Sequence, residues 1–101
     1  MTGVKHTVVL VLGCVLFAVA LVGCGGGPSE AEKAITYSNR GLASYNLGQY
    51  ERAIQDYDQA IRLDPQNALA YYGRGLVYKE LDKSTEAELD IAKAKELGYD
   101  P

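Results

Sequence analysis

The sequence predicts an all-α protein: two tandem helix–turn–helix units, a short α-solenoid, placed after an apolar segment and a flexible linker. Two observations carry this prediction. Residues 34–67 and 68–101 repeat one pattern, and small and aromatic residues recur within each at helical spacing. The chain has 101 residues, which is enough for one small domain.

The charge balance argues against a nucleic-acid-binding protein. Thirteen acidic residues outweigh ten basic ones, for a formal net charge of −3, and the Lys and Arg residues form no cluster. The two cysteines, Cys14 and Cys24, lie in the apolar segment or at its end. Residues after Cys24 can therefore form neither a disulfide framework nor a cysteine zinc site.

The apolar segment from Thr7 to Gly23 contains no charged residue, and Lys5 precedes it. Its length of about 17 residues is long for the core of a signal peptide and slightly short for a membrane span, which needs about 20. An uncleaved anchor helix therefore stays open as an alternative to a cleaved signal. Both arrangements place the rest of the chain outside the cytoplasm.

Leu21-Val22-Gly23-Cys24 favours the cleaved signal, because it resembles the lipobox of bacterial lipoproteins. That motif requires a branched apolar residue three places before the cysteine and a small residue directly before it. The resemblance implies a signal peptide over 1–23, cleavage between Gly23 and Cys24, and lipidation of Cys24, with fatty-acyl chains such as palmitate. The similar Val11-Leu12-Gly13-Cys14 is rejected, because its apolar core of about six residues is too short.

The lipidated Cys24 and the Gly-rich linker make up residues 24–29, in which Gly25-Gly26-Gly27-Pro28 has no reason to pack. Ser29-Glu30-Ala31-Glu32 then fits a capping box, with Ser29 as the N-cap and Glu32 reaching back. We therefore expect the helical domain to span 30–101.

Each repeat is predicted to contain two helices that cross where their side chains are small, with a tyrosine filling the space beside them. Leu47-Gly48-Gln49 turns the chain between the helices of the first repeat. Asp64-Pro65 ends its second helix, because a residue before proline disfavours the α region. The facing positions are Tyr37, Gly41 and Ser44 on the first helix and Ala53, Tyr57 and Ala60 on the second.

These positions resemble the tetratricopeptide repeat, whose unit is about 34 residues long. The first repeat departs from the usual pattern at Ser44, where a tyrosine is common. The second repeat keeps Gly75, Tyr78, Ala87 and Ala94, and departs at Asp82, Ile91 and Tyr99. The resemblance implies two tandem repeats, 34–67 and 68–101, and a function in protein binding.

The sequence offers no set of catalytic residues, so we expect no enzymatic activity, no cofactor and no metal. The single histidine, His6, precedes the domain, which excludes Ser/His/Asp and Cys/His sets within it. Asp56 and Asp58 would point about 200° apart on a helix. We therefore expect both to be solvated surface residues.

The family resemblance implies that the first helices of the two repeats line a concave groove, which holds a peptide or a partner helix. Ser38 and Leu42 stand where some members bind a C-terminal carboxylate with Lys and Asn, so that mode is disfavoured. The predicted groove residues are Ser38, Asn39, Leu42, Tyr45, Asn46, Leu69, Tyr72, Gly73, Leu76 and Lys79.

The last helix is predicted to present a more polar outer face than the helix one repeat earlier. Ile54 and Ile61 form a stripe suited to packing on a following unit, and their equivalents are Glu88 and Lys95. This pattern predicts a solvating cap and a complete, short array.

Together these features predict a lipoprotein of the bacterial cell envelope that acts as a protein–protein interaction adaptor or assembly factor. Gly25, and not Asp, follows Cys24, which favours the outer membrane if the cell has two. An obligate small structural subunit of a larger envelope complex is the alternative. The expected partner is a protein or peptide, and the membrane is engaged through the N-terminal lipid.

Overall fold

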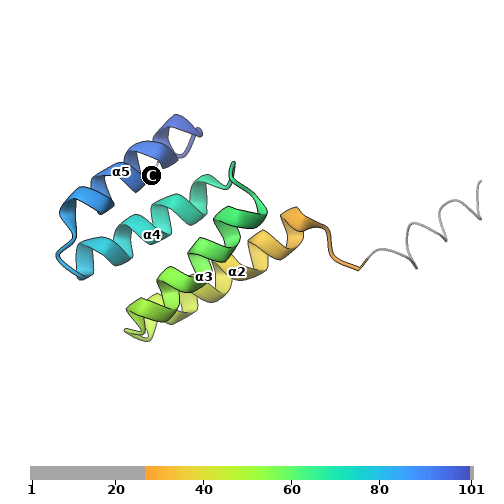
Figure 1. The fold of residues 1–101 in the computed structure, drawn as a ribbon, viewed down its shortest axis with the longest axis horizontal. Helices are drawn as coiled ribbons and strands as arrows, with labels where there is room; N and C mark the ends of the chain where they lie inside the picture. The colour runs from red at the N-terminus through yellow and green to blue at the C-terminus, as the bar shows by residue number, and fades with distance from the viewer. Residues whose placement is uncertain (1–26, 101) are drawn as a thin grey trace, which may run out of the picture.

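The computed structural model describes residues 27–100, in which four α-helices are joined by short turns (Figure 1). Within this part of the chain there is no β-strand, so the predicted all-α fold of two helix–turn–helix units is confirmed. The helices are α2 (Glu30–Asn46), α3 (Tyr50–Leu63), α4 (Ala68–Glu80) and α5 (Ser84–Glu96).

The helices stack in chain order into a short solenoid. α2 packs against α3 and α4 against α5, so each unit is a helical hairpin, and α3 packs against α4 to join the units. Figure 1 shows α4 between α3 and α5. α2 also touches α4 along a smaller interface, whereas α5 contacts α4 alone among the described helices. The first helices of both units therefore adjoin each other.

Caps and turn residues determine where the helices begin and end. Glu32 N donates to Ser29 Oγ at 3.2 Å, and Ser29 N donates to Glu32 Oε2 at 2.7 Å, which confirms the predicted capping box. Gly48 follows α2 with a φ of +74°, a conformation that glycine adopts without strain. Asp82 has the same place in the second unit, with a φ of +58°. α3 ends directly before Asp64-Pro65, as predicted.

Small side chains make up most of the buried core. Alanine and glycine at a helix crossing let the two backbones approach closely, because the distance between helix axes depends on the side chains at the contact. The predicted buried face of Ala53, Tyr57 and Ala60 on α3 is confirmed. The buried apolar residues are Ala34, Ala53, Tyr57, Ala60, Ala70, Val77, Ala87 and Ala94.

Tyr57 is the largest of these buried side chains, and it contacts the first helices of both units. A Cβ added to Gly41 of α2 would lie 3.0 Å from Tyr57 Cε1, and one added to Gly73 of α4 would lie 2.5 Å from its Oη. Both glycines therefore sit directly against the ring. Burial away from water raises the pKa of the Tyr57 phenol to about 12, so the buried group stays neutral at physiological pH.

The second unit is built around a smaller side chain. Ile91 stands one repeat after Tyr57, and a Cβ on Gly75 would lie 2.9 Å from Ile91 Cγ1 and 3.2 Å from Ala87 O. Gly75 thus lets α4 and α5 approach as Gly41 lets α2 and α3 approach. Ile91 remains half-buried, and no further helix of the described chain covers α5.

The outer face of α5 is mostly polar, as predicted. Ile54 and Ile61 of α3 pack against the core, whereas Glu88 and Lys95, one repeat later, are exposed. Leu89 is also exposed, so the face is not wholly polar.

None of the four described helices is both long and apolar enough to cross a membrane. The membrane prediction rests on the apolar run of residues 7–23, which lies outside the described part of the chain. The predicted cleavage site at Gly23 and lipidated Cys24 lie outside it as well.

Gly73→Ala is expected to destabilise the domain by about 1–3 kcal/mol, because the new Cβ overlaps the ring of Tyr57 and overpacking has costs of this size. The loss should appear although alanine is the better helix former by about 1 kcal/mol. Chemical denaturation of the full-length chain, followed by circular dichroism, measures the effect. Asn39→Ala, at the equivalent exposed position on α2, is the control and should change stability by less than about 0.5 kcal/mol. Unchanged stability of Gly73→Ala would contradict the packing.

Candidate protein-binding surface

The first helices of both units expose apolar side chains. Leu42 of α2 and Leu69 of α4 belong to the predicted groove, and each is about half exposed. Ile35, which the sequence analysis did not single out, is exposed to a similar extent. It lies two turns before Leu42 and one repeat before Leu69, so the three share equivalent sides of adjoining helices. We call Ile35, Leu42, Leu69 and the half-buried Leu76 the apolar surface.

Polar side chains border the apolar surface. Asn46 of α2 and Lys79 of α4, both predicted groove residues, are exposed. Tyr45 Oη donates to Glu80 Oε1 at 3.3 Å, which links the two first helices. Burial, and then the Glu80 carboxylate, raise the pKa of Tyr45, so its hydroxyl remains a donor at neutral pH. A partner would therefore meet amide, ammonium and carboxylate groups beside apolar side chains.

Tyr72 is partly covered by the C-terminal end of its own chain. Its ring centroid lies 4.6 Å from that of Tyr99, with the planes tilted by 39°. Tyr99 is held in place after α5 because its backbone N donates to Ala94 O at 2.9 Å. Tyr72 therefore offers less free area than Leu42 or Leu69, and it is half-buried.

Two predicted groove residues, Ser38 and Gly73, lie in the helix packing and not on the open surface. Ser38 is buried, and its Oγ accepts from Asn67 Nδ2 at 3.2 Å. Gly73 faces the ring of Tyr57. Asn39, one repeat before Gly73, is exposed, but it belongs to that same side of its helix. Position in the repeat alone did not separate the groove from the side that stacks on a neighbouring unit.

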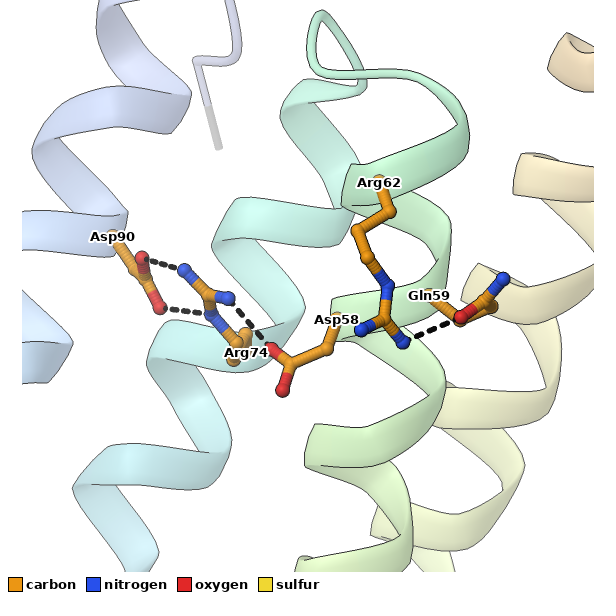
Figure 2. Close-up of polar contacts among 5 residues, drawn as sticks. All are labelled: Asp58, Gln59, Arg62, Arg74 and Asp90. Atoms are coloured by element: carbon orange, nitrogen blue, oxygen red, sulfur yellow. Dashed lines mark hydrogen bonds and ion pairs between the residues drawn. The ribbon is translucent and has the colours of Figure 1, made fainter.

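One arginine joins three helices at the contact between the units (Figure 2). Arg74 of α4 binds Asp90 of α5 through Nε to Oδ2 at 2.7 Å and through Nη2 to Oδ1 at 2.8 Å. Its Nη1 donates to Asp58 Oδ1 of α3 at 2.6 Å. The hydrogen bonds to Asp90 and then Asp58 raise the pKa of Arg74 above its ordinary value. Arg74 is therefore a fixed cation that ties α3, α4 and α5 together.

Arg40 and Asp56 form the corresponding pair in the first unit. Arg40 Nε and Nη2 both donate to Asp56 Oδ1, at 3.0 and 2.6 Å. Asp56 is only 3% exposed, so the expectation that it is a solvated surface residue was wrong. A buried carboxylate needs a partner, and Arg40 provides it. Asp58 is half-exposed and paired. The identity of Asp56 and Asp90 one repeat apart was the signal that could have indicated this.

Arg40 with Asp56, and Arg74 with Asp58 and Asp90, thus form structural ion pairs. Within residues 27–100, no group of three His, Cys, Asp or Glu side chains is placed to hold a metal ion. The two buried aspartates are both engaged with arginines. What the arrangement offers to other molecules is a surface, formed chiefly by α2 and α4.

Comparisons with known proteins find similarity within the helical repeats. A family model described as TPR repeat matches residues 41–82, and one described as tetratricopeptide repeat matches residues 68–97. The protein STIP1 homolog of Dictyostelium discoideum is 40% identical over 71 residues, which are 70% of this chain and 13% of that protein. Stress-induced-phosphoprotein 1 of Caenorhabditis elegans is 37% identical over 67 residues, 66% of this chain and 21% of that protein. The mitochondrial import receptor subunit TOM70 of Rattus norvegicus is 35% identical over 74 residues, 68% and 12% of the two chains.

Two stacked helical hairpins with an exposed side on their first helices define a helical-repeat domain. Together the two family models match residues 41–97, so the two hairpins are tetratricopeptide repeats, a repeat that mediates protein–protein interactions. The chain spans only 13% of the Dictyostelium relative and 21% of the Caenorhabditis one. The activities and partners of those longer proteins are therefore not transferred to it.

Asp90→Asn is expected to destabilise the domain by about 2–4 kcal/mol, because Asp90 is 6% exposed and its loss breaks a buried ion pair. Asp58→Asn should cost less than about 1 kcal/mol, because the Asp58 side chain is 42% exposed and solvent screens its pairing. Denaturation curves of the two full-length variants test this difference. Equal losses would contradict the distinct roles of the two carboxylates.

Proposed function

We propose that this chain is a membrane-anchored tetratricopeptide repeat lipoprotein that docks protein partners in the bacterial cell envelope, as an adaptor or assembly factor. The observation that carries the binding role is the apolar surface. Ile35, Leu42 and Leu69 are each about half exposed on adjoining helices, although the domain is small and has few large apolar residues to bury. Large apolar side chains gathered on one side of a small domain are typical of an interaction site.

The chemistry of this surface suits a peptide or helix with apolar side chains. Leu42 and Leu69 would contact these side chains, while Asn46 and Lys79 lie within the same region to bind carbonyl or carboxylate groups. Two repeats provide a short surface, so we expect an affinity of about 1–10 μM. Confinement of both molecules at a membrane would raise the effective concentration and strengthen the interaction.

The anchor is the part of the proposal that rests on sequence alone. Cleavage before Cys24 and acylation of its thiol would attach the mature chain to the membrane, since each buried CH₂ contributes about 0.8 kcal/mol. Four linker residues separate Cys24 from Ser29, and fully extended they reach at most about 14 Å. The repeats would thus work close to the lipid headgroups, on the extracytoplasmic side and, in a cell with two membranes, on the outer one.

Photo-crosslinking in native envelopes tests the binding role. A photoreactive residue at Leu42 or Leu69 should capture a discrete protein, because both side chains are exposed on the apolar surface. The control position is Gln55, which is exposed on α3 and points about 200° away from the buried Tyr57. If Gln55 captures the same protein as efficiently, the apolar surface is not the docking site. A domain that aggregates unless a partner is co-expressed would instead favour an obligate subunit.

Cys24→Ala tests the anchor. The variant should fail to incorporate radiolabelled palmitate and should keep its N-terminal segment, because the thiol that accepts the lipid is missing. Labelling followed by gel electrophoresis and mass spectrometry of the N-terminus measures both effects, and Cys14→Ala is the matched control that should mature normally. Continued acylation of Cys24→Ala would refute the lipobox interpretation.

A further inference from the structure

The outer side of α2 has the positions of a helix-packing face but no helix of the described chain upon it. One repeat later, the same positions on α4 pack against α3: Ala70 and Val77 are fully buried there, and Gly73 lies against Tyr57. On α2 these positions are exposed, and Leu47 is 73% exposed. We call the side formed by Thr36, Asn39, Arg40, Ala43 and Leu47 the outer side of α2.

A comparison of Arg40 with Arg74, one repeat later, shows that the outer side of α2 lacks a carboxylate. Arg74 uses Nε and Nη2 for the aspartate of its own unit and Nη1 for Asp58 of the preceding unit. Arg40 uses Nε and Nη2 for Asp56 in the same way. Within residues 27–100 its Nη1 has no carboxylate partner, and its side chain is 54% exposed, against 21% for Arg74. The position that Asp58 fills beside Arg74 is thus open beside Arg40.

Asp56 provides a second sign that the ion pair at Arg40 is incomplete. Its Oδ2 is buried and has no hydrogen-bond partner within the described residues, because both Arg40 nitrogen atoms donate to Oδ1. Asp90, by contrast, receives one bond on each oxygen. A second carboxylate on Nη1 would hold Arg40 as Asp58 holds Arg74, in the orientation that satisfies both oxygens of its aspartate.

Neither the described residues 27–100 nor residues 1–26 supply this carboxylate. Residues 1–26 contain neither Asp nor Glu, and the residue one repeat before Asp58 is Cys24. A second copy stacked end to end would present α5, where Ala92 occupies the position of Asp58. We therefore propose that the outer side of α2 docks an acidic amphipathic helix of another protein, which places a carboxylate on Arg40. This proposal concerns a different side of α2 from the apolar surface and does not rest on the proposed function.

The residues of the outer side restrict which helix fits. A partner helix placed as α3 is placed on α4 would bring its equivalent of Tyr57 against Asn39, where α4 has Gly73. That position must therefore hold a small residue. Apolar residues at the places of Ile54 and Ile61 would pack on the outer side of α2, as those isoleucines pack against the core.

A peptide with the sequence of residues 48–67 and the change Tyr57→Ala is the probe, because it keeps the acid and the apolar stripe and removes the ring. The labelled peptide is titrated with the full-length chain in a mild nonionic detergent, and fluorescence anisotropy reports binding. We expect saturable binding that weakens at least tenfold when the peptide also carries Asp58→Asn. The amide keeps the shape of the side chain and removes the charge that Arg40 would bind.

Substitutions in the chain locate the site without disturbing the buried pair. Ala43→Glu should weaken binding at least tenfold, because a carboxylate three residues after Arg40 reaches the guanidinium and competes with the peptide. Ala92→Glu on α5 is the matched control, since Ala92 is also exposed, and should leave binding unchanged. Leu42→Glu alters the apolar surface and should also leave binding of the peptide unchanged.

Three results would overturn the inference. One is equal binding of the peptide with and without the Asp58→Asn change, or no saturable binding of either form. Another is loss of binding in Leu42→Glu but not in Ala43→Glu, which would place the peptide on the apolar surface and leave the proposed function standing. The third is self-association of the chain, seen by sedimentation and abolished by Ala43→Glu, which would make a second copy the occupant.

Discussion

The packing of one tyrosine ring between two glycines determines how the helices of this domain are placed. Tyr57 of α3 touches Gly41 within its own hairpin and Gly73 of the next unit. The close approach of α2 to α3 and that of α4 to α3 therefore depend on the same side chain. A two-repeat array has little core and a single interface between its units. Because Tyr57 belongs both to the first hairpin and to that interface, we expect the hairpin and the stacking to form together.

Ion pairs add a directional constraint to the apolar packing of the helices. Arg74 binds one carboxylate in its own hairpin and another in the preceding one. A planar guanidinium has a preferred geometry for each of its bonds, so it sets the register of α4 against both neighbours. Arg40 performs half of this role at the other end of the array.

Much of the fold could be predicted from the sequence, because small residues at a fixed period leave few ways for helices to pack. Gly41 was identified in this way. The contact of Gly73 with the same ring and the burial of Asp56 were missed, because periodicity describes one helix at a time and these features depend on a neighbouring helix. The candidate surface was predicted in part: Leu42 is exposed as expected, whereas Ile35 was not singled out. An apolar residue in the first turns of a helix resembles a core residue until its neighbours are known.

The unequal support of the two units has a dynamic consequence. Among the described helices α5 rests on α4 alone, with Ile91 where the first unit has its tyrosine, so it has the fewest contacts to lose on local opening. Amide hydrogens should therefore exchange fastest toward the C-terminal end, in a fraying motion that spares α2 and α3. Tyr99 stacks on Tyr72 at that end, so each opening also uncovers a face of α4. A ligand that holds Tyr72 in its open state would promote this fraying, and one that needs the stack would suppress it.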